Sequence, residues 1–173
     1  MSQLKVNSIV PVGGLPSGAS GGIIQIVSTT KTDTFSATST STAADITGMS
    51  VTITPSSNSN KVFVMYSVHV SADGNYGGQG LILVRGSTEI AIGDAAGSRP
   101  RVTSLVKGNE AYGNVLSQHF LDSPATTSAT TYKLQHRDSS TDNPIYINRN
   151  RTDSNNTGYV RTSSSITVME VTV

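Results

Sequence analysis

The feature that most constrains the fold is a strict alternation between residues 61 and 71. Five apolar residues occupy every second position there: Val62, Val64, Tyr66, Val68 and Val70. This period of two is that of a β-strand with one buried face. Phe63 and Met65 make the first half apolar on the other face as well, and polar residues follow on that face. The pattern predicts a strand that starts between two layers and ends with one wet face.

Short β-like segments separated by turn clusters continue to the end of the chain. Further strands are predicted at residues 23–30, 45–54, 81–84, 88–92, 101–106, 112–121, 130–137, 144–148 and 164–173. Gly86 and Ser87 predict a two-residue hairpin turn. In the last strand the apolar positions change face between Val168 and Met169, which predicts two buried faces or a bulge. Without helical periodicity, this spacing predicts an all-β fold, a β-sandwich or jelly roll.

Residues 1–22 are predicted to form an extended arm and a hinge, ahead of a β-domain at residues 23–173. The arm carries Leu4, Val6, Ile9, Val10 and Val12, and a short strand is predicted at residues 4–10. Closely spaced Gly and Pro follow, which break helix and strand alike. The arm is interpreted as an anchor on a partner subunit or a neighbouring protein. The alternative is an edge strand added to its own domain.

Composition excludes several classes of function. Charged residues make up 13% of the chain, while Ser and Thr together supply 48 of 173 residues, as in exposed β-structure. A net charge of +1 gives no basic field for nucleic acid. Cysteine is absent, and no apolar run is long enough for membrane insertion. The first residues lack the apolar core of a signal peptide, so assembly in the cytoplasm is expected.

Catalytic, metal and cofactor sites are not expected, and the chain is predicted not to be an enzyme. Six aspartates stand beside turn residues and are interpreted as turn caps: Asp73, Asp94, Asp122, Asp138, Asp142 and Asp153. A cation site at Asp138 and Asp142 is the weaker alternative, because the ligand spacing of a calcium loop is missing. The histidines His69, His119 and His136 lie far apart in sequence, which favours core or surface roles over zinc binding.

A cluster of basic and aromatic residues is the candidate binding site. Arg149 and Arg151 follow the strand at 144–148, and Arg161 is near in sequence. Arginines of this kind bind phosphate or an acidic sugar, while a solvated loop or a contact between subunits is the alternative. Tyrosines near loops can stack on sugars. The candidate glycan contacts are Tyr76, Tyr112, Tyr146, Arg149, Arg151 and Tyr159.

Several segments, in order, carry a resemblance that reaches almost the whole chain. They are residues 4–9, 22–35, 45–57, 61–64, 84–88, 93–99 and 121–127. The sequence resembles a family of short virion structural or tail-fibre-like proteins of marine and freshwater tailed bacteriophages, including cyanophages. In architecture alone, it is also similar to the trimeric jelly-roll heads of the tumour necrosis factor and complement type.

The resemblance implies a virion structural protein that is assembled in the host cytoplasm and exposed on the virion surface. It implies a homotrimer, anchored through its arm to capsid or tail, that serves as a head fibre, a cement or decoration protein, or a knob. The alternative is a tail-fibre tip that binds host surface polysaccharide. A depolymerase is the third hypothesis. Closed rotational symmetry suits such assemblies, and three arms on one trimer gain avidity.

Overall fold

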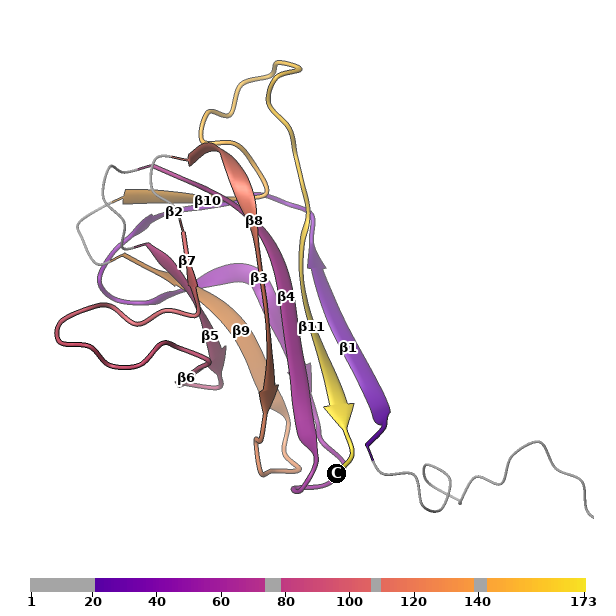
Figure 1. Cartoon of the computed structure of the whole chain (residues 1–173). Coiled ribbons are helices and arrows are strands. Elements are labelled where there is room, and N and C mark those ends of the chain that lie inside the picture. The colour runs from indigo at the N-terminus through magenta and orange to yellow at the C-terminus, as the bar shows by residue number, and fades with distance from the viewer. Residues whose placement is uncertain (1–20, 74–78, 107–109, 139–142) are drawn as a thin grey trace, which may run out of the picture.

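The computed structural model describes residues 21–73, 79–106, 110–138 and 143–173, which contain eleven β-strands and no helix (Figure 1). The strands are β1 (Ile23–Lys31), β2 (Phe35–Ser39), β3 (Ala44–Ile53), β4 (Lys61–Ala72), β5 (Gly80–Arg85), β6 (Thr88–Ile90), β7 (Ser104–Leu105), β8 (Glu110–Asp122), β9 (Thr130–Arg137), β10 (Asn143–Ile147) and β11 (Ser164–Val171). Within these ranges no helix offers the length and apolarity that crossing a membrane requires.

The strands form two antiparallel sheets, one of six strands and one of five, which pack face to face (Figure 1). In the large sheet β4 is central: β8 pairs along one side of it, and β11 and β10 share the other side. The strand β1 lies beyond β11, and β2 lies beyond β10. The small sheet has the order β3-β9-β5, with β6 and β7 on the far edge of β5. The predicted all-β sandwich is confirmed.

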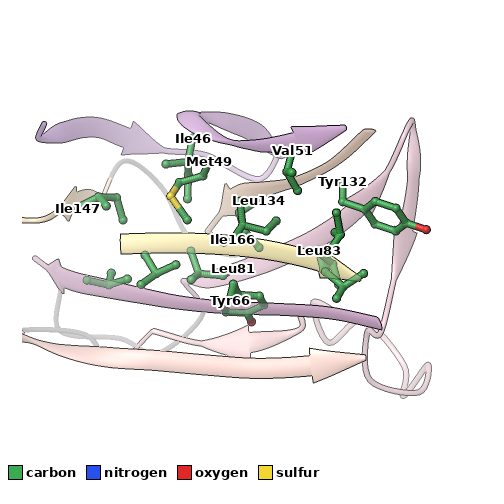
Figure 2. Close-up of a cluster of buried hydrophobic side chains, with 14 of the residues drawn as sticks. Ile46, Met49, Val51, Tyr66, Leu81, Leu83, Tyr132, Leu134, Ile147 and Ile166 are labelled. Carbon is green, nitrogen blue, oxygen red and sulfur yellow. The ribbon is translucent and has the colours of Figure 1, made fainter. Parts of the chain in front are cut away.

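The core lies between the sheets and is built from alternate positions of the strands. Figure 2 shows Met49, Leu134 and Ile166 pointing into the space between the layers. All three side chains are fully buried, as are Val62, Val64 and Val68 from β4. β9 and β11 thereby place one side of their period-two pattern in the core and leave the other side for the surface, whereas β5 is buried on both sides.

Most of the strand predictions are confirmed, and two regions differ. The hairpin turn after β5 is present, with Gly86 at a φ of 59°, and its second strand is short. Of the strand predicted at residues 101–106, only β7 forms. β2 was not predicted, because Phe35 is the only large apolar residue in its five. It forms because it pairs with β10 along all five of its residues.

The prediction for the outward face of β4 is wrong: its first half was expected to be buried and its second half exposed, and the structure shows the reverse. On the outward face Met65 and Ser67 are exposed, whereas His69 and Ser71 are buried. Residues beyond the strand cover this second half: the Ser71 hydroxyl donates to the Arg149 carbonyl at 2.8 Å. Gly113 of β8 lies so close to His69 that an added Cβ would come within 2.6 Å of the imidazole.

The two faces predicted for β11 are real, but neither predicted explanation holds. Ile166 and Val168 point into the core, while Met169 and Val171 lie half-buried on the outward face. The strand runs in regular register with β4, and the bulge lies in β1, between Ile23 and Gln25. The described residues therefore leave the apolar outward face of β11 only partly covered.

The predicted arm lies outside the described residues, apart from Gly21 and Gly22. At that point Gly22 is tied to the C-terminal strand region: its amide donates to the Thr172 hydroxyl at 2.9 Å, and its carbonyl accepts from the Thr172 amide at 2.9 Å. Where the chain enters β1, it therefore lies beside the end of β11.

Neither Asp122 nor Glu170 was predicted to be buried, yet the side chains of both are. Asp122 does not cap a turn, because it ends β8 at 5% exposure and binds Arg85 and the buried Tyr132 hydroxyl. Glu170 is 1% exposed and shares the inward face of Ile166 and Val168. Its Oε1 accepts from the Ser56 amide and hydroxyl, each at 2.7 Å, and from Asn60 Nδ2 at 2.6 Å.

The Glu170 site predicts an acid-sensitive contribution to stability. Burial raises the pKa of Glu170, but hydrogen bonds from Asn60 and Ser56 outweigh it and hold the pKa below its usual value of 4.5. A lowered folded-state pKa stabilises the fold above about pH 4.5, and this benefit disappears as pH falls through the folded-state value. The free-energy difference between the wild type and Glu170→Gln should therefore be largest at neutral pH and shrink in acid. Urea unfolding at about pH 7 and about pH 3 measures it; a difference independent of pH would contradict this role.

Candidate interaction surfaces

The outward side of the large sheet carries an uncharged surface across β1, β11, β4 and β8. The strand registers align its side chains in three rows of four. The rows are Ile26–Met169–Phe63–Leu121, Ser28–Thr167–Met65–His119 and Thr30–Ser165–Ser67–Ser117. We call these twelve residues the outer face. None of the twelve is Lys, Arg, Asp or Glu.

The chemistry of the outer face is graded from apolar to hydroxyl-bearing. In the first row Ile26 and Leu121 are 60% and 46% exposed, and in the second Met65 is 42% exposed. The Phe63 and His119 rings lie 5.7 Å apart. The Ser28 and Thr167 hydroxyls share a hydrogen bond of 2.8 Å, and the third row carries only Ser and Thr. Exposed apolar strips of this kind are typical of surfaces that contact another molecule.

A second surface lies at one end of the sandwich, in the loop of residues 148–163 that joins β10 to β11. Figure 1 shows this β10–β11 loop extending beyond the ends of the sheets. Its two arms are joined by an antiparallel bridge between Arg149 and Arg161 and by the Thr162 amide, which donates to the Asn148 carbonyl at 3.3 Å. Its tip is closed by a bond of 3.0 Å from the Tyr159 amide to the Asn156 carbonyl. The loop thus has a hydrogen-bonded structure of its own.

Asp153 joins the two arms of the loop electrostatically. Its Oδ1 lies 2.6 Å from Arg161 Nη2, and its Oδ2 lies 2.9 Å from Arg149 Nη1. The bonds from Arg161 and Arg149 hold the pKa of Asp153 below its usual value. The Arg149 guanidinium also lies over the Tyr146 ring, 4.4 Å from its centroid. A cation–π contact of this kind fixes the arginine in place.

The loop also borders a hollow of about 390 Å³ that is open to solvent and is lined by residues between 150 and 161. Asn150 is 3% exposed, and its Oδ1 has no hydrogen-bond partner in the part of the chain that the structure describes. The other lining residues are exposed, among them Thr152 and Tyr159. Sequence reasoning missed Asn150, since one Asn in an Asn-rich loop gives no signal.

The predicted glycan contacts are partly brought together. Tyr146 and Arg149 touch, and Tyr159 lies at the tip of the same loop. Arg151 forms an ion pair of 3.0 Å with Asp73 after β4, so it ties the loop to the sheet.

Tyr112 lies near the start of β8 and is 68% exposed. Tyr76 lies outside the described residues, as do the predicted anchor residues Leu4, Val6, Ile9, Val10 and Val12.

The histidines do not converge. His119 is exposed on the outer face, His69 is buried at the end of β4, and His136 is buried in β9 of the other sheet. Burial lowers the pKa of both His69 and His136. In the described ranges no three His, Cys, Asp or Glu residues lie close enough to hold a metal ion. Asp138 is buried and accepts from Asn143 Nδ2 at 2.6 Å, whereas Asp142 lies outside the described residues.

Another hollow, of about 380 Å³, lies beside β9 and was not predicted. Three arginines line it, and each is bound within the chain. Arg137 forms an ion pair of 3.0 Å with Glu89, Arg101 Nε donates to the Gly93 carbonyl, and Arg99 donates to the Ala96 carbonyl. The bond that holds the loop of residues 93–101 against the small sheet is the one that Arg137 Nη2 donates to the Arg101 carbonyl.

No protein-family model matches the sequence, and no curated protein matches it. Among solved structures, a chain from the structure of the Gt strain of infectious bursal disease virus matches with a TM-score of 0.45 and 13% identity. The match covers 97% of this chain and 44% of that chain. The VP2 subviral particle of that virus matches with a TM-score of 0.41 and 13% identity, covering 98% and 44%.

Dimeric latent PorU from Porphyromonas gingivalis matches with a TM-score of 0.41 and 11% identity, covering 90% of this chain and 14% of that chain. This chain therefore spans less than half the length of each of the three proteins. Likenesses this distant establish neither a family nor a function.

Proposed function

We propose that this protein is a structural component of a bacteriophage virion, exposed on the particle surface as a homotrimer. The trimer is anchored to capsid or tail through residues 1–22 and serves as a head fibre, a cement or decoration protein, or a knob. The single observation that carries this proposal is the uncharged outer face. A module that assembles with its own copies needs a surface of this kind.

The outer face favours a second copy of this chain as its occupant. Its twelve positions lack Lys, Arg, Asp and Glu, so no charged partner is needed to neutralise it. Closed rotational symmetry brings the same face of each copy to a common axis, where uncharged residues meet without like-charge repulsion. Aliphatic and aromatic side chains in the first row bury apolar area, and the hydroxyl rows can hydrogen-bond to one another.

The geometry of the sandwich supports a tethered, outward-facing module. β1, which follows the arm, is an edge strand of the large sheet and contributes three residues to the outer face. At residue 22 the chain is fixed to Thr172, so a pull on the arm acts directly on the sheet. Three arms on one trimer hold a particle by avidity even where each arm binds weakly.

The anchor is tested by deleting residues 2–20, which leaves Gly21 and Gly22 in place. We expect the shortened protein to fold and self-associate but to be lost from purified phage particles, because nothing then ties it to capsid or tail. The matched control keeps the length of the arm and replaces its apolar side chains with serine: Leu4, Val6, Ile9, Val10 and Val12. Quantitative mass spectrometry of particles measures incorporation. Particles that carry the shortened protein at wild-type copy number would rule out the anchor.

Recognition of host surface polysaccharide by a tail-fibre tip is the second candidate function. The observation that favours it is the hollow in the β10–β11 loop, where the lining residue Asp153 is paired with Arg149, which in turn stacks on Tyr146. Both functions are compatible with one module, since the loop and the outer face occupy different parts of the sandwich.

A further inference from the structure

We propose that the large sheet continues from one copy of this chain to the next, with the free edge of β8 paired to the free edge of β1 in the neighbouring copy. This inference rests on the proposed homotrimer and adds a backbone contact to the side-chain contact of the outer face. It is carried by the direction of the backbone groups on the two edges, by the direction of the strands and by the residues along each edge.

The strands β1 and β8 border the large sheet on opposite sides of β11 and β4. Among the described residues, β8 pairs only with β4, and β1 pairs only with β11. The register of β8 with β4 is regular over residues 114–122, and that of β1 with β11 is regular over residues 25–31. Each edge therefore presents a regular run of strand whose outward backbone groups no described strand uses.

The bonds of β4 show which backbone groups of β8 point to its free edge. The His69 amide donates to Ser164 Oγ at 3.1 Å, and the His69 carbonyl accepts from the Asn148 amide at 3.1 Å. Both groups of His69 thus point away from β8, so the residue opposite on β8, Val115, makes no backbone bond across this pair. The backbone groups of Val115 and of every second residue after it, which are the outer-face residues of β8, therefore point to the free edge.

The outer-face residues of β1 point their backbone groups to the opposite free edge. On β8 the His119 amide donates to the Gln118 side chain at 3.2 Å, as expected of a group on the free edge. Bonded and unbonded pairs alternate across an antiparallel sheet. In the row of His119 the pair with Met65 is unbonded, so the pair of Met65 with Thr167 is bonded. The pair of Thr167 with Ser28 is then unbonded, and the backbone groups of Ser28 point away from β11.

These directions allow the sheet to continue from one copy to the next without a break in its pattern. The four strands β1, β11, β4 and β8 alternate in direction, so β8 of one copy runs antiparallel to β1 of its neighbour in a ring around an axis along the strands. Outer-face residues then oppose each other as bonded pairs, and their side chains stay on one side of the joined sheet. Three copies close the ring and leave neither edge free.

The residues along the two edges favour pairing over exposure to water. Soluble proteins usually protect a free edge with proline, with charged side chains or with a bulge. Neither regular run contains proline, and the charged residues Lys31 and Asp122 stand only at the ends of the runs. The Lys31 side chain is buried and bonded to Asp33, and Asp122 is buried and bonded to Arg85. The bulges of β1 and β8 lie outside these runs.

Proline substitutions test the backbone contact in the full-length protein. Ser117→Pro on β8 and Thr30→Pro on β1 each remove an N–H that points to a free edge, a position where strands tolerate proline. The matched controls Ser117→Val and Thr30→Val change the same exposed side chains and keep the N–H. We expect each proline variant to fold but to associate roughly tenfold more weakly than its valine control, because a backbone bond is lost and the ring obstructs the neighbouring strand. Sedimentation equilibrium measures the association, and circular dichroism verifies the fold.

Hydrogen exchange gives a second measurement, which decides if a proline variant does not fold. Amides of residues 26–30 and 115–121 should exchange more slowly in the wild-type oligomer than in Met65→Asp monomers. Proline and valine variants that associate equally, in an oligomer that Met65→Asp dissociates, would overturn edge pairing and leave the outer-face contact standing. A monomeric wild type would overturn both. Weakening by Ser117→Pro alone, or slow exchange on β8 that is lost when residues 2–20 are deleted, would overturn β1 as the strand that pairs with β8.

Discussion

Met65→Asp should turn the assembled protein into monomers. Met65 is 42% exposed in the single chain and lies in the second row of the outer face, on the central strand β4. Around a symmetry axis each copy would place an aspartate against the same apolar and hydroxyl-bearing surface. Unpaired like charges at an interface cost several kcal/mol, so association should weaken by at least about 100-fold.

The fold of the Met65→Asp variant should persist, because the residue is already partly exposed and an outward substitution changes stability by about 1 kcal/mol or less. Thr52→Asp is the matched control: Thr52 is exposed on β3, between the buried Val51 and Ile53, and thus faces outward from the small sheet. Light scattering after size-exclusion chromatography gives the molar masses. A Met65→Asp protein with the same mass as Thr52→Asp would exclude the outer face as the site of assembly.

Asp122→Ala should be among the most destabilising single substitutions in the described part of the chain. Arg85 Nη1 lies 2.7 and 2.8 Å from the two carboxylate oxygens of Asp122, and the buried Tyr132 hydroxyl donates to Oδ2 at 2.6 Å. These contacts fasten the end of β8 in the large sheet to β5 and β9 in the small one. Burial, followed by the bond to Asp122, raises the pKa of Tyr132 far above its usual value.

Removing the carboxylate leaves the Tyr132 hydroxyl without its acceptor and Arg85 without its counter-ion. Breaking a buried pair in this way costs roughly 3–5 kcal/mol, which for a chain of this size lowers Tm by about 10 °C. Asp45→Ala is the control, since Asp45 forms an exposed ion pair of 2.9 Å with Lys133 and exposed pairs contribute less than about 1 kcal/mol. Thermal unfolding of both variants compares them. Equal losses of stability would show that Asp122 does not fasten the sheets.

Alternating apolar patterns in the sequence predicted most of the strands of the fold. The alternation of Val62 to Val70 located β4, and pairing with β8, β10 and β11 made it the centre of the large sheet. β2 was not predicted because its small and hydroxyl-bearing residues give no strong strand pattern. It is a strand because it pairs with β10. The burial of His69 and Ser71 could not be predicted from the sequence either, because the residues that cover them come from distant parts of the chain.

The positions of Asp122 and Glu170 within the alternating pattern of their strands indicate that both side chains point inward. Glu170 lies on the same face as Ile166 and Val168, so its parity along β11 indicates an inward position. Asp122 likewise shares parity with Phe120, which packs against the core. Ser123 and Pro124, which follow Asp122, suggested a turn and hid the alternation there. The cluster at the β10–β11 loop was predictable in part, because Tyr146, Arg149 and Tyr159 are close in sequence. The burial of Asn150 was not predictable.

The central claim is that copies of this chain meet through the outer face, and a spin-label pair tests it directly. The sequence has no cysteine, so Ser67→Cys introduces a unique thiol at an exposed position in the third row on β4. Thr127→Cys does the same in the loop between β8 and β9, away from that face. We predict dipolar coupling between copies for the label at position 67 and weaker or no coupling for the label at position 127. An oligomer in which the label at position 67 shows no coupling would contradict the account, and so would a protein that remains monomeric.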